Sequence, residues 1–343
     1  MKDPRPKVVL RADAGEYIGF GHLVRTSALA NYLRDDFDCM IACRCDLPSA
    51  EPFVDRLISE AGATRYRVDV EPDADRPTFD KHFLGSLNHD HITVLDNYFY
   101  DYIYQLQARQ MSRALVSIHD MPGYRSGADV FFTASPLQDT DFRLELDTLF
   151  YGGTEWAFLR EPFLRPLKQR TSAKIGRVVI GMGGADPLGI TNVMIDRVRN
   201  VIPDVEIDVI AGPGVEISRP DLPNVRIHRN ADAKAVADLL DEADFGIFPA
   251  STAAIEAIAR RLPFAVGFFA DNQKRFHSHF VNQGWAYDLG DLRTMEDKLE
   301  QRLRDIVADY DPGHSAHLDF AAHRQDVVKI FKELWDFSAR RFL

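Results

Sequence analysis

The sequence is poor in the features that mark several classes of protein. Its three cysteines, Cys39, Cys43 and Cys45, lie in one short segment, which excludes a disulfide framework. No run of Lys and Arg exceeds two residues and the formal net charge is −11, so we expect no nucleic-acid partner. No apolar stretch approaches the roughly 20 residues that span a bilayer, and a strand, not a signal peptide, follows the N-terminal residues. We therefore expect a cytoplasmic protein without stable membrane insertion.

The cysteine-rich segment is better explained as a buried strand than as a metal site. The three thiols fall at spacings that place them on one face of a strand, where small apolar side chains are common. A zinc site would need a fourth ligand and usually a Cys-x-x-Cys spacing. We predict no metal ion and no bound cofactor.

Length and pattern indicate two α/β domains. A chain of 343 residues exceeds what one hydrophobic core usually holds, and its 45% hydrophobic content excludes a disordered class. Short apolar runs alternate with helical patterns nearly throughout, which predicts doubly wound parallel sheets with helices on both faces. The predicted strands are Val8–Arg11, Asp38–Cys43, Ile92–Leu95, Ala114–His119, Val130–Thr133, Val178–Gly181, Glu206–Ile210, Val225–His228, Phe245–Ile247 and Phe264–Phe268.

A proline-rich, polar interval separates two such series. We predict an N-terminal Rossmann-like domain over residues 1–161, a linker over 162–173, a second Rossmann-like domain over 174–310 and a C-terminal segment over 311–343. A wide apolar stripe after Gln325 predicts a core-packing helix in the last segment. Open α/β sheets bind ligands at the carboxyl ends of their strands, so we expect the ligand in a cleft between the domains.

The clearest site signal is the segment KVVLRADAGEYIGFGHLVRTSALANYL near the N-terminus. Val8 to Leu10 are typical of a strand buried on both faces, and Gly19 and Gly21 then permit positive φ or close approach to a ligand. His22 follows in the first turn of a predicted helix, whose free N–H groups favour anions. The third glycine of the dinucleotide fingerprint is missing, because Val24 stands at its position and Arg25 follows, so we predict no nicotinamide cofactor. On these residues alone, a simple capping role for His22 stays open.

A second turn of this kind occurs in the C-terminal half. Gly183, Gly184 and Asp186 follow a predicted buried strand and precede a helix that begins near Ile190. Backbone N–H groups in such a turn can face a ligand, although a plain strand-to-helix turn favours the same residues.

A third turn carries hydroxyls and a carboxylate. Ser251 and Thr252 stand at a predicted helix N-terminus, which suits a diphosphate, and Glu256 in that helix could accept both hydroxyls of a ribose. An N-cap followed by a solvated glutamate explains the same pattern, and alone it would be favoured.

Taken together in this order, these segments carry a family resemblance. The chain resembles the UDP-2,4-diacetamido-2,4,6-trideoxy-β-L-altropyranose hydrolases of pseudaminic acid synthesis and the related spore coat polysaccharide proteins. The resemblance rests on RADAGEYIGFGHLVRTSALA, LDNYFYD, YGGTEWAFLREPF, GMGGADPLGIT and the block from Asp244 to Gln273 that ends in ADNQ. It spans residues 7 to about 290.

This resemblance implies a two-domain GT-B-like hydrolase that cleaves a UDP-amino sugar at the anomeric carbon, with inversion and without a metal. His22 stands at the position of the family's catalytic base, and Asp13 would orient the imidazole or the sugar. UDP would be held mainly by the C-terminal domain, and the final helix would cross back to the first domain. The implied substrate-binding residues are Arg11, Gly19, Gly21, Arg25, Asp96, Tyr98, Gly183, Gly184, Asp186, Ser251, Thr252, Glu256, Asn272 and Gln273.

Departures from the family pattern leave the sugar and the acceptor open. The chain has Ala250–Ala253 where the family usually has Gly-Gly-Ser-Thr, Ile118–Asp120 reads Ile-His-Asp where Ile-Asp-Asp is usual, and the Leu-Asn element is replaced around Thr133. The alternative is an inverting GT-B glycosyltransferase that passes the sugar to a polysaccharide or lipid-linked acceptor. A nucleotide-sugar binding protein without turnover would predict loss of the base, yet His22 is present.

Overall fold

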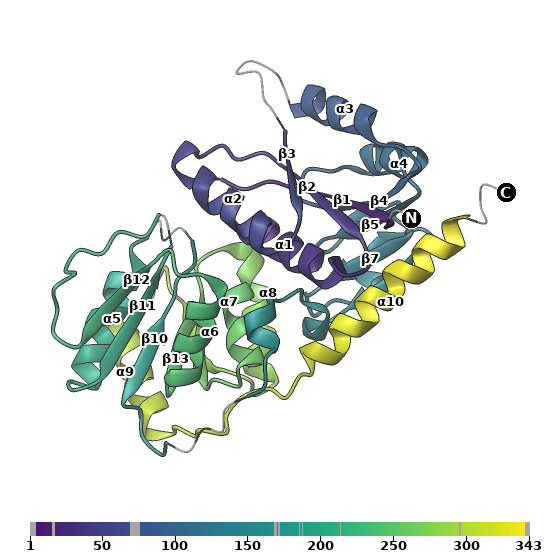
Figure 1. Ribbon diagram of the computed structural model, residues 1–343. Helices are drawn as coiled ribbons and strands as arrows, with labels where there is room; N and C mark the ends of the chain where they lie inside the picture. The colour runs from purple at the N-terminus through teal and green to yellow at the C-terminus, as the bar shows by residue number, and fades with distance from the viewer. Residues whose placement is uncertain are drawn as a thin grey trace. The chain divides into compact units, whose positions relative to one another are not determined.

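A computed structural model describes residues 5–15, 18–68, 76–167, 170, 172–184, 186, 188–212, 214–294 and 296–339. The chain divides into two compact units (Figure 1). Unit 1 comprises the residues up to Arg160 together with those from Phe320 onward, and unit 2 is Glu161–Asp319. Each unit is built around an open parallel sheet of its own, which agrees with the predicted α/β class.

The described part of unit 1 contains a seven-stranded sheet in the order β3-β2-β1-β4-β5-β7-β9, in which all pairs are parallel. The order reverses between β1 and β4, which makes this pair the topological switch point. The strands are β1 (Lys7–Ala12), β2 (Asp38–Cys43), β3 (Thr64–Arg67), β4 (His91–Asp96), β5 (Ala114–Ile118), β7 (Val130–Thr133) and β9 (Leu149–Gly152), and β6 (Arg125–Ser126) pairs with β8 (Arg143–Leu144) outside this sheet.

Helices cover both faces of the unit 1 sheet. On one face, side chains of α3 and α4 pack against Val9, Leu95 and Leu115, and on the other α1 lies against β1 and β2. Helix α10 contacts α1 and β5 and buries Phe331, so the C-terminal helix is part of the core of unit 1. The helices are α1 (Gly21–Leu33), α2 (Glu51–Glu60), α3 (Arg76–Ser86), α4 (Tyr102–Met111) and α10 (Phe320–Ala339), with 3₁₀ turns at Pro48–Ala50, Asp139–Asp141 and Thr154–Trp156.

Unit 2 repeats the same plan with a six-stranded parallel sheet in the order β12-β11-β10-β13-β14-β15. Its switch point lies between β10 and β13. The strands are β10 (Arg177–Ile180), β11 (Glu206–Ala211), β12 (Val225–Arg229), β13 (Phe245–Pro249), β14 (Phe264–Phe268) and β15 (Tyr287–Asp291). The helices are α5 (Ile190–Val201), α6 (Ala233–Glu242), α7 (Thr252–Ala259), α8 (Lys274–Asn282) and α9 (Glu296–Ala308), with 3₁₀ turns at Glu161–Leu164 and Asp271–Gln273.

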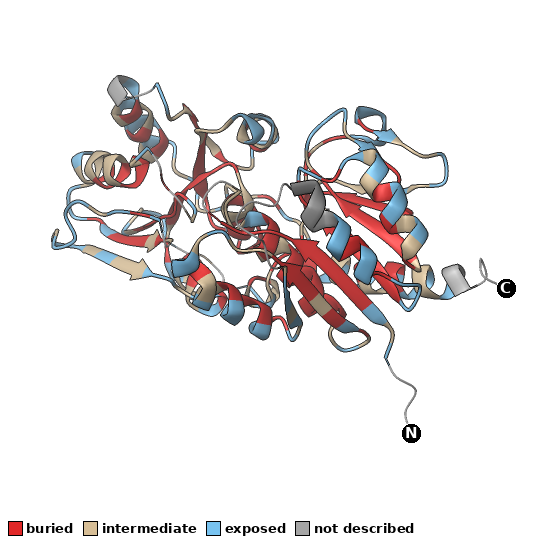
Figure 2. Ribbon diagram, turned by 90° about the horizontal axis from the view of Figure 1, so that it is seen from above, coloured by how far each residue is buried: buried red, intermediate tan, exposed pale blue. Residues whose placement is uncertain are grey.

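The central strands of both sheets are buried (Figure 2). In β10 the three residues Val178, Val179 and Ile180 are at most 1% exposed, as expected for a strand covered on both faces. Ile180 belongs to a cluster with Met194 of α5 and Leu303 of α9, so these two helices cover one face of the unit 2 sheet.

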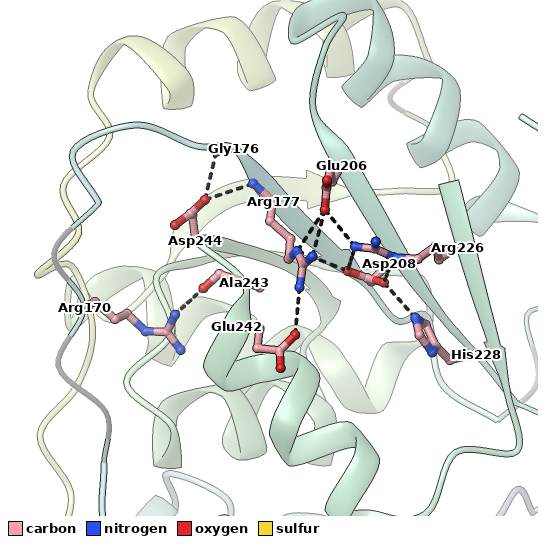
Figure 3. Close-up of polar contacts among 10 residues, drawn as sticks. All are labelled: Arg170, Gly176, Arg177, Glu206, Asp208, Arg226, His228, Glu242, Ala243 and Asp244. Atoms are coloured by element: carbon pink, nitrogen blue, oxygen red, sulfur yellow. Dashed lines mark hydrogen bonds and ion pairs between the residues drawn. The ribbon is translucent and has the colours of Figure 1, made fainter. Parts of the chain in front are cut away.

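The opposite face carries an ionic cluster at β11 and β12 (Figure 3). The Asp208 carboxylate, 2% exposed, accepts hydrogen bonds from Arg226 Nε at 3.0 Å and His228 Nε2 at 2.7 Å. Burial would raise the pKa of Asp208, but these hydrogen bonds outweigh it and hold the pKa below its usual range. Arg177 and Arg226 also bind Glu206. This cluster stabilises the sheet near its amino end, away from the strand ends where ligands bind.

The predicted linker is attached to unit 2 over the residues that the structure describes. The buried guanidinium of Arg260 donates to the carbonyl oxygens of Phe163, Arg165 and Pro166, and Arg170 donates to the carbonyl of Ala243. The segment therefore differs from a free connector, because Arg260 satisfies main-chain carbonyls within it and Arg170, which belongs to it, satisfies a carbonyl elsewhere in unit 2. Residues 311–319, which we assigned to the C-terminal segment, also belong to unit 2.

All ten predicted strands are confirmed, whereas the strands that pattern analysis missed lie at sheet edges. Three of these end a sheet, namely β3 (TRYR), β9 (LFYG) and β15 (YDLGD). An edge strand has one neighbour and is partly exposed, so it needs no continuous apolar run. The helices predicted to begin around His22, near Ile190 and at Thr252 are also confirmed.

Candidate active site

His22 lies at the switch point of unit 1. Strand β1 ends at Ala12, which pairs with Asp96 at the end of β4, and the chain then enters α1 with His22 as its second residue. Gly15 and Gly19 exchange backbone hydrogen bonds across the intervening loop, and Gly19 has a φ of 72°, which glycine adopts without strain. Local backbone geometry and sheet topology together bring the His22 imidazole to the carboxyl end of β4.

Asp96 holds the His22 ring. The His22 Nδ1 lies 2.7 Å from Asp96 Oδ1, and both side chains are buried, at 5% and 0% exposed. Burial would raise the pKa of Asp96, but Arg25 and His22 outweigh burial and hold it well below its usual range. Since Asp96 is ionised, Nδ1 carries the hydrogen and donates it, which leaves the lone pair on Nε2. This tautomer can accept a proton at Nε2.

Arg25 joins Asp96 to a second carboxylate. Its Nε and Nη2 donate to the two oxygens of Asp96, each at 2.7 Å, and its Nη1 donates to Asp120. Thr26 adds a hydrogen bond to Asp96 at 2.9 Å, and Thr133 adds one to Asp120 at 3.2 Å. Arg25 and Asp96 are bound to each other, and their predicted contact with substrate stays a prediction.

Two aromatic rings continue the site beyond the imidazole. The Tyr98 ring meets His22 edge-on at 4.6 Å between centroids and meets His119 edge-on at 5.3 Å. His119 is stacked on Tyr124 and its Nδ1 accepts the backbone N–H of Met121. Burial lowers the pKa of His119 to about 4, so this ring is neutral at pH 7. Tyr98, predicted as a substrate contact, is 38% exposed beside the candidate base.

The imidazole contact that the family resemblance implied for Asp13 is made by Asp96, and the other implied role of Asp13, toward the sugar, stays a prediction. Asp13 is paired with Arg11 and accepts a hydrogen bond from Asn97 at 3.2 Å. The Arg11 guanidinium is 2% exposed and lies near the rings of Phe83 and Tyr100. This burial does not support the predicted contact of Arg11 with substrate, which stays a prediction. Both residues form a buried ion pair behind the loop.

Sequence reasoning missed Asp120, His119 and Thr26 as members of this site. His119 and Asp120 were named only as part of the segment Ile118–Asp120, in which His119 departs from the family pattern. A usable signal existed, since both follow directly after β5 and therefore stand at the same sheet edge as Asp96. Thr26 lies one helical turn beyond His22 on α1, where a residue at i+4 faces the same side.

In unit 2, the glycine turn after β10 packs directly against another loop. A Cβ at Gly212 would lie 2.5 Å from the Cα of Gly184, so this close approach excludes a side chain. Gly183 has a φ of 95°. Asp186 is buried and accepts the N–H groups of Ile190 and Thr191, at 2.9 and 2.7 Å. Asp186 therefore caps α5, and its predicted contact with substrate stays a prediction.

The turn after β13 places Ser251 and Thr252 at the start of α7. Ser251 is the N-cap, and its side chain makes no capping hydrogen bond within the described residues. Glu256 lies in α7 and is 7% exposed, so it is not a solvated helix glutamate. Because the loops after β10 and β13 flank the switch point of unit 2, the sheet brings both predicted nucleotide-binding turns to one place.

Asn272 and Gln273 lie in the 3₁₀ turn that follows β14. The Gln273 Oε1 accepts the backbone N–H groups of Phe269 and Ala270, so this side chain shapes its own loop. Asn272 is exposed. Unit 2 also has a cavity of about 310 Å³, whose lining includes Leu188, Ile190, Leu299 and Arg293.

The described residues contain neither a metal-binding cluster nor a membrane-spanning helix. No group of three or more His, Cys, Asp or Glu side chains is arranged to hold a metal ion there, and the three cysteines are free. In the same part of the chain, no helix combines the length and apolar character needed to cross a membrane.

Comparison with known proteins establishes the fold. No protein-family model matches the chain. It is 22% identical over 297 residues to the uncharacterized protein MJ1062 of Methanocaldococcus jannaschii, and the match covers 81% of this chain but only 58% of that protein. The chain thus spans less than two thirds of this relative's length.

Similar solved structures include MurG of Acinetobacter baumannii, with a TM-score of 0.61 and 14% identity over 96% of this chain and all of that one. The glycotransferase of kitacinnamycin gives 0.59 and 15% over 98% of both chains. HepE of Anabaena, solved with UDP and glucose, gives 0.59 and 13% over 98% of this chain and all of that one. The chain therefore has the GT-B fold, built from two Rossmann-like units.

Proposed function

We propose that this chain is an inverting, metal-independent enzyme that breaks the bond between the anomeric carbon and the diphosphate of a UDP-sugar. The observation that carries the proposal is the buried His22–Asp96 pair at the switch point of unit 1. Asp96 directs the imidazole so that Nε2 can take a proton from an attacking hydroxyl group. The turns after β10 and β13 of unit 2 would hold UDP, with N–H groups and the Ser251 and Thr252 hydroxyls facing the diphosphate.

Of the two possible reactions, we favour transfer of the sugar to an alcohol. The similar folds include the kitacinnamycin glycotransferase and a protein that binds UDP and glucose, which supports a glycosyltransferase. A hydrolase is the second candidate, because the motifs from residue 7 to about 290 resemble UDP-amino-sugar hydrolases of pseudaminic acid synthesis. In both cases His22 would deprotonate the nucleophile. The two reactions would therefore share one base and differ in whether the nucleophile is an alcohol or water.

The test is UDP release from a panel of UDP-sugars, measured with and without acceptor alcohols. Release that depends on an acceptor and yields a glycoside of inverted configuration supports the transferase. Release without an acceptor, with free sugar as the second product, supports the hydrolase. In both cases His22→Ala should lower kcat by about 10²-fold or more, because a positioned general base contributes at least that much.

His317→Ala is the matched control, because His317 is an exposed histidine of unit 2. UDP affinity, measured by calorimetry, should stay unchanged in His22→Ala, since the predicted UDP contacts belong to unit 2. Turnover in His22→Ala equal to that of the control would refute the assignment of the base. Failure of the wild-type chain to bind UDP would refute the nucleotide-sugar function itself.

A further inference from the structure

Three charged side chains follow His22 in an unbroken series. His22 Nδ1 contacts Asp96, Asp96 accepts two hydrogen bonds from Arg25, and the third nitrogen of the guanidinium donates to Asp120. The series joins α1, the end of β4 and the loop after β5. Arg25 thus links Asp120 to the candidate base.

Burial makes the charges in this series matter. The side chains of Arg25 and Asp120 are 14% and 12% exposed, and Asp96 is fully buried. Charges shielded from water interact more strongly than charges on the surface, because solvent screens them less. Each charge removed from the series should therefore alter the cost of placing a further charge on the imidazole.

The neighbouring groups leave the charge balance of the series unchanged. Burial lowers the pKa of His119 to about 4, so this histidine is neutral at pH 7. Tyr98 meets the imidazole with a ring edge, and Asp13 is neutralised by its own partner Arg11. The groups that decide the charge around His22 are therefore the two carboxylates and one guanidinium of the series.

Two carboxylates and one guanidinium carry a net charge of −1 while His22 is neutral. When His22 takes a proton, the four groups sum to zero. Without Asp120, the series would be neutral before the proton arrives and positive afterwards. Arg25 Nη2 lies 3.3 Å from His22 Nδ1, so a guanidinium balanced by Asp96 alone would repel the imidazolium more strongly than one balanced by two carboxylates.

We propose that Asp120 is a positioning residue that acts on His22 through Arg25, balancing the guanidinium so that the imidazole can accept a proton. Thr133 fixes the far oxygen of Asp120 by a hydrogen bond of 3.2 Å. The effect of Asp120 on the protonation of His22 does not depend on the proposed function, whereas its role in catalysis rests on that function. If His22 is the base, Asp120 stabilises the imidazolium formed when the nucleophile loses its proton.

The decisive experiment follows the titration of His22 in the free enzyme by NMR of histidine-labelled protein, assigned with His22→Ala. In Asp120→Asn, the midpoint of the His22 titration should move down by roughly one pH unit relative to wild type, since a buried negative charge is lost. Asp120→Glu keeps the charge and should restore the wild-type midpoint. Asp35→Asn is the matched control, because Asp35 is an exposed carboxylate of the same unit.

Arg25→Gln provides an independent test with the opposite sign. Loss of the positive charge should move the midpoint of the His22 titration upward, and this result stands even where Asp120→Asn does not fold. A midpoint that is unchanged in a folded Asp120→Asn, or that moves downward in Arg25→Gln, would overturn the proposal.

Activity gives a second readout. In Asp120→Asn, the acid limb of the kcat/KM profile should shift to lower pH together with the NMR midpoint, whereas a merely structural role would lower the rate at every pH without moving the limb. Full activity in His22→Ala would refute the assignment of His22 as the base, yet the NMR titration in wild type, Asp120→Asn and Arg25→Gln would still test the link from Asp120 to His22.

Discussion

Arg260 offers a test of the structure that requires no knowledge of the substrate. Its guanidinium is completely buried in unit 2 and contacts both oxygens of Asp241, at 2.8 and 3.1 Å. It also donates to the carbonyl oxygens of Phe163, Arg165 and Pro166, at 3.3, 2.7 and 3.2 Å. The perturbation is Arg260→Met, which keeps an unbranched apolar chain and removes every one of these hydrogen bonds.

The expected loss follows from what the substitution leaves behind. Asp241 is 2% exposed and would keep Arg165 as an ion-pair partner, while three main-chain acceptors would lose a donor. Removal of one partner from a buried ion pair typically costs about 3–5 kcal/mol of unfolding free energy. For a unit of this size, each kcal/mol lowers Tm by roughly 2–4 °C, so the expected decrease is roughly 6–20 °C.

The assay is urea unfolding, monitored by hydrogen exchange and mass spectrometry. Peptides from α6 and α7 report on unit 2 alone. Arg261→Met is the matched control, because it removes the same side chain from an exposed position next in sequence. A loss below about 1 kcal/mol in Arg260→Met, or equal losses in both variants, would refute the inference that these contacts anchor residues 163–166 to unit 2.

Three further predictions concern the carboxylates and the glycine turn. Asp96→Asn no longer fixes the tautomer of His22, so kcat should fall by roughly 10²–10⁴-fold in steady-state assays while UDP affinity stays unchanged; an undiminished kcat would contradict the orienting role. The pKa of Asp208 is held below its usual range, so the stabilisation by Asp208 is present above about pH 4 and is lost as pH falls further. Asp208→Asn should therefore have a lower unfolding free energy at pH 7. Its unfolding free energy should also decrease less steeply below about pH 4, which acid titrations of unfolding measure. Gly212→Ala would force its Cβ against the backbone of Gly184 and should weaken UDP binding in calorimetry, whereas unchanged affinity would argue against that turn as a phosphate site.

Much of the fold follows from local pattern. The buried strands are continuous apolar runs, and glycines or small polar residues mark the turns at His22, Ile190 and Thr252, so strand positions and helix starts were predictable. The edge strands were not, because a half-exposed strand such as TRYR carries no distinctive pattern. The attachment of residues 163–166 to unit 2 was also hidden, since it depends on a buried arginine far along the chain.

The candidate site divides in the same way. Local sequence was enough to predict that a histidine opens a helix after a buried strand, and that turns with glycine or hydroxyl residues follow two strands of the second unit. The tertiary structure alone decided the partners: Asp96, 74 residues from His22, orients the imidazole in place of nearby Asp13, and Asp120, 95 residues from Arg25, completes the charge balance. The physical reason is that helix starts and turns depend on neighbouring residues, whereas ion pairs depend on which strand ends the sheet order brings together.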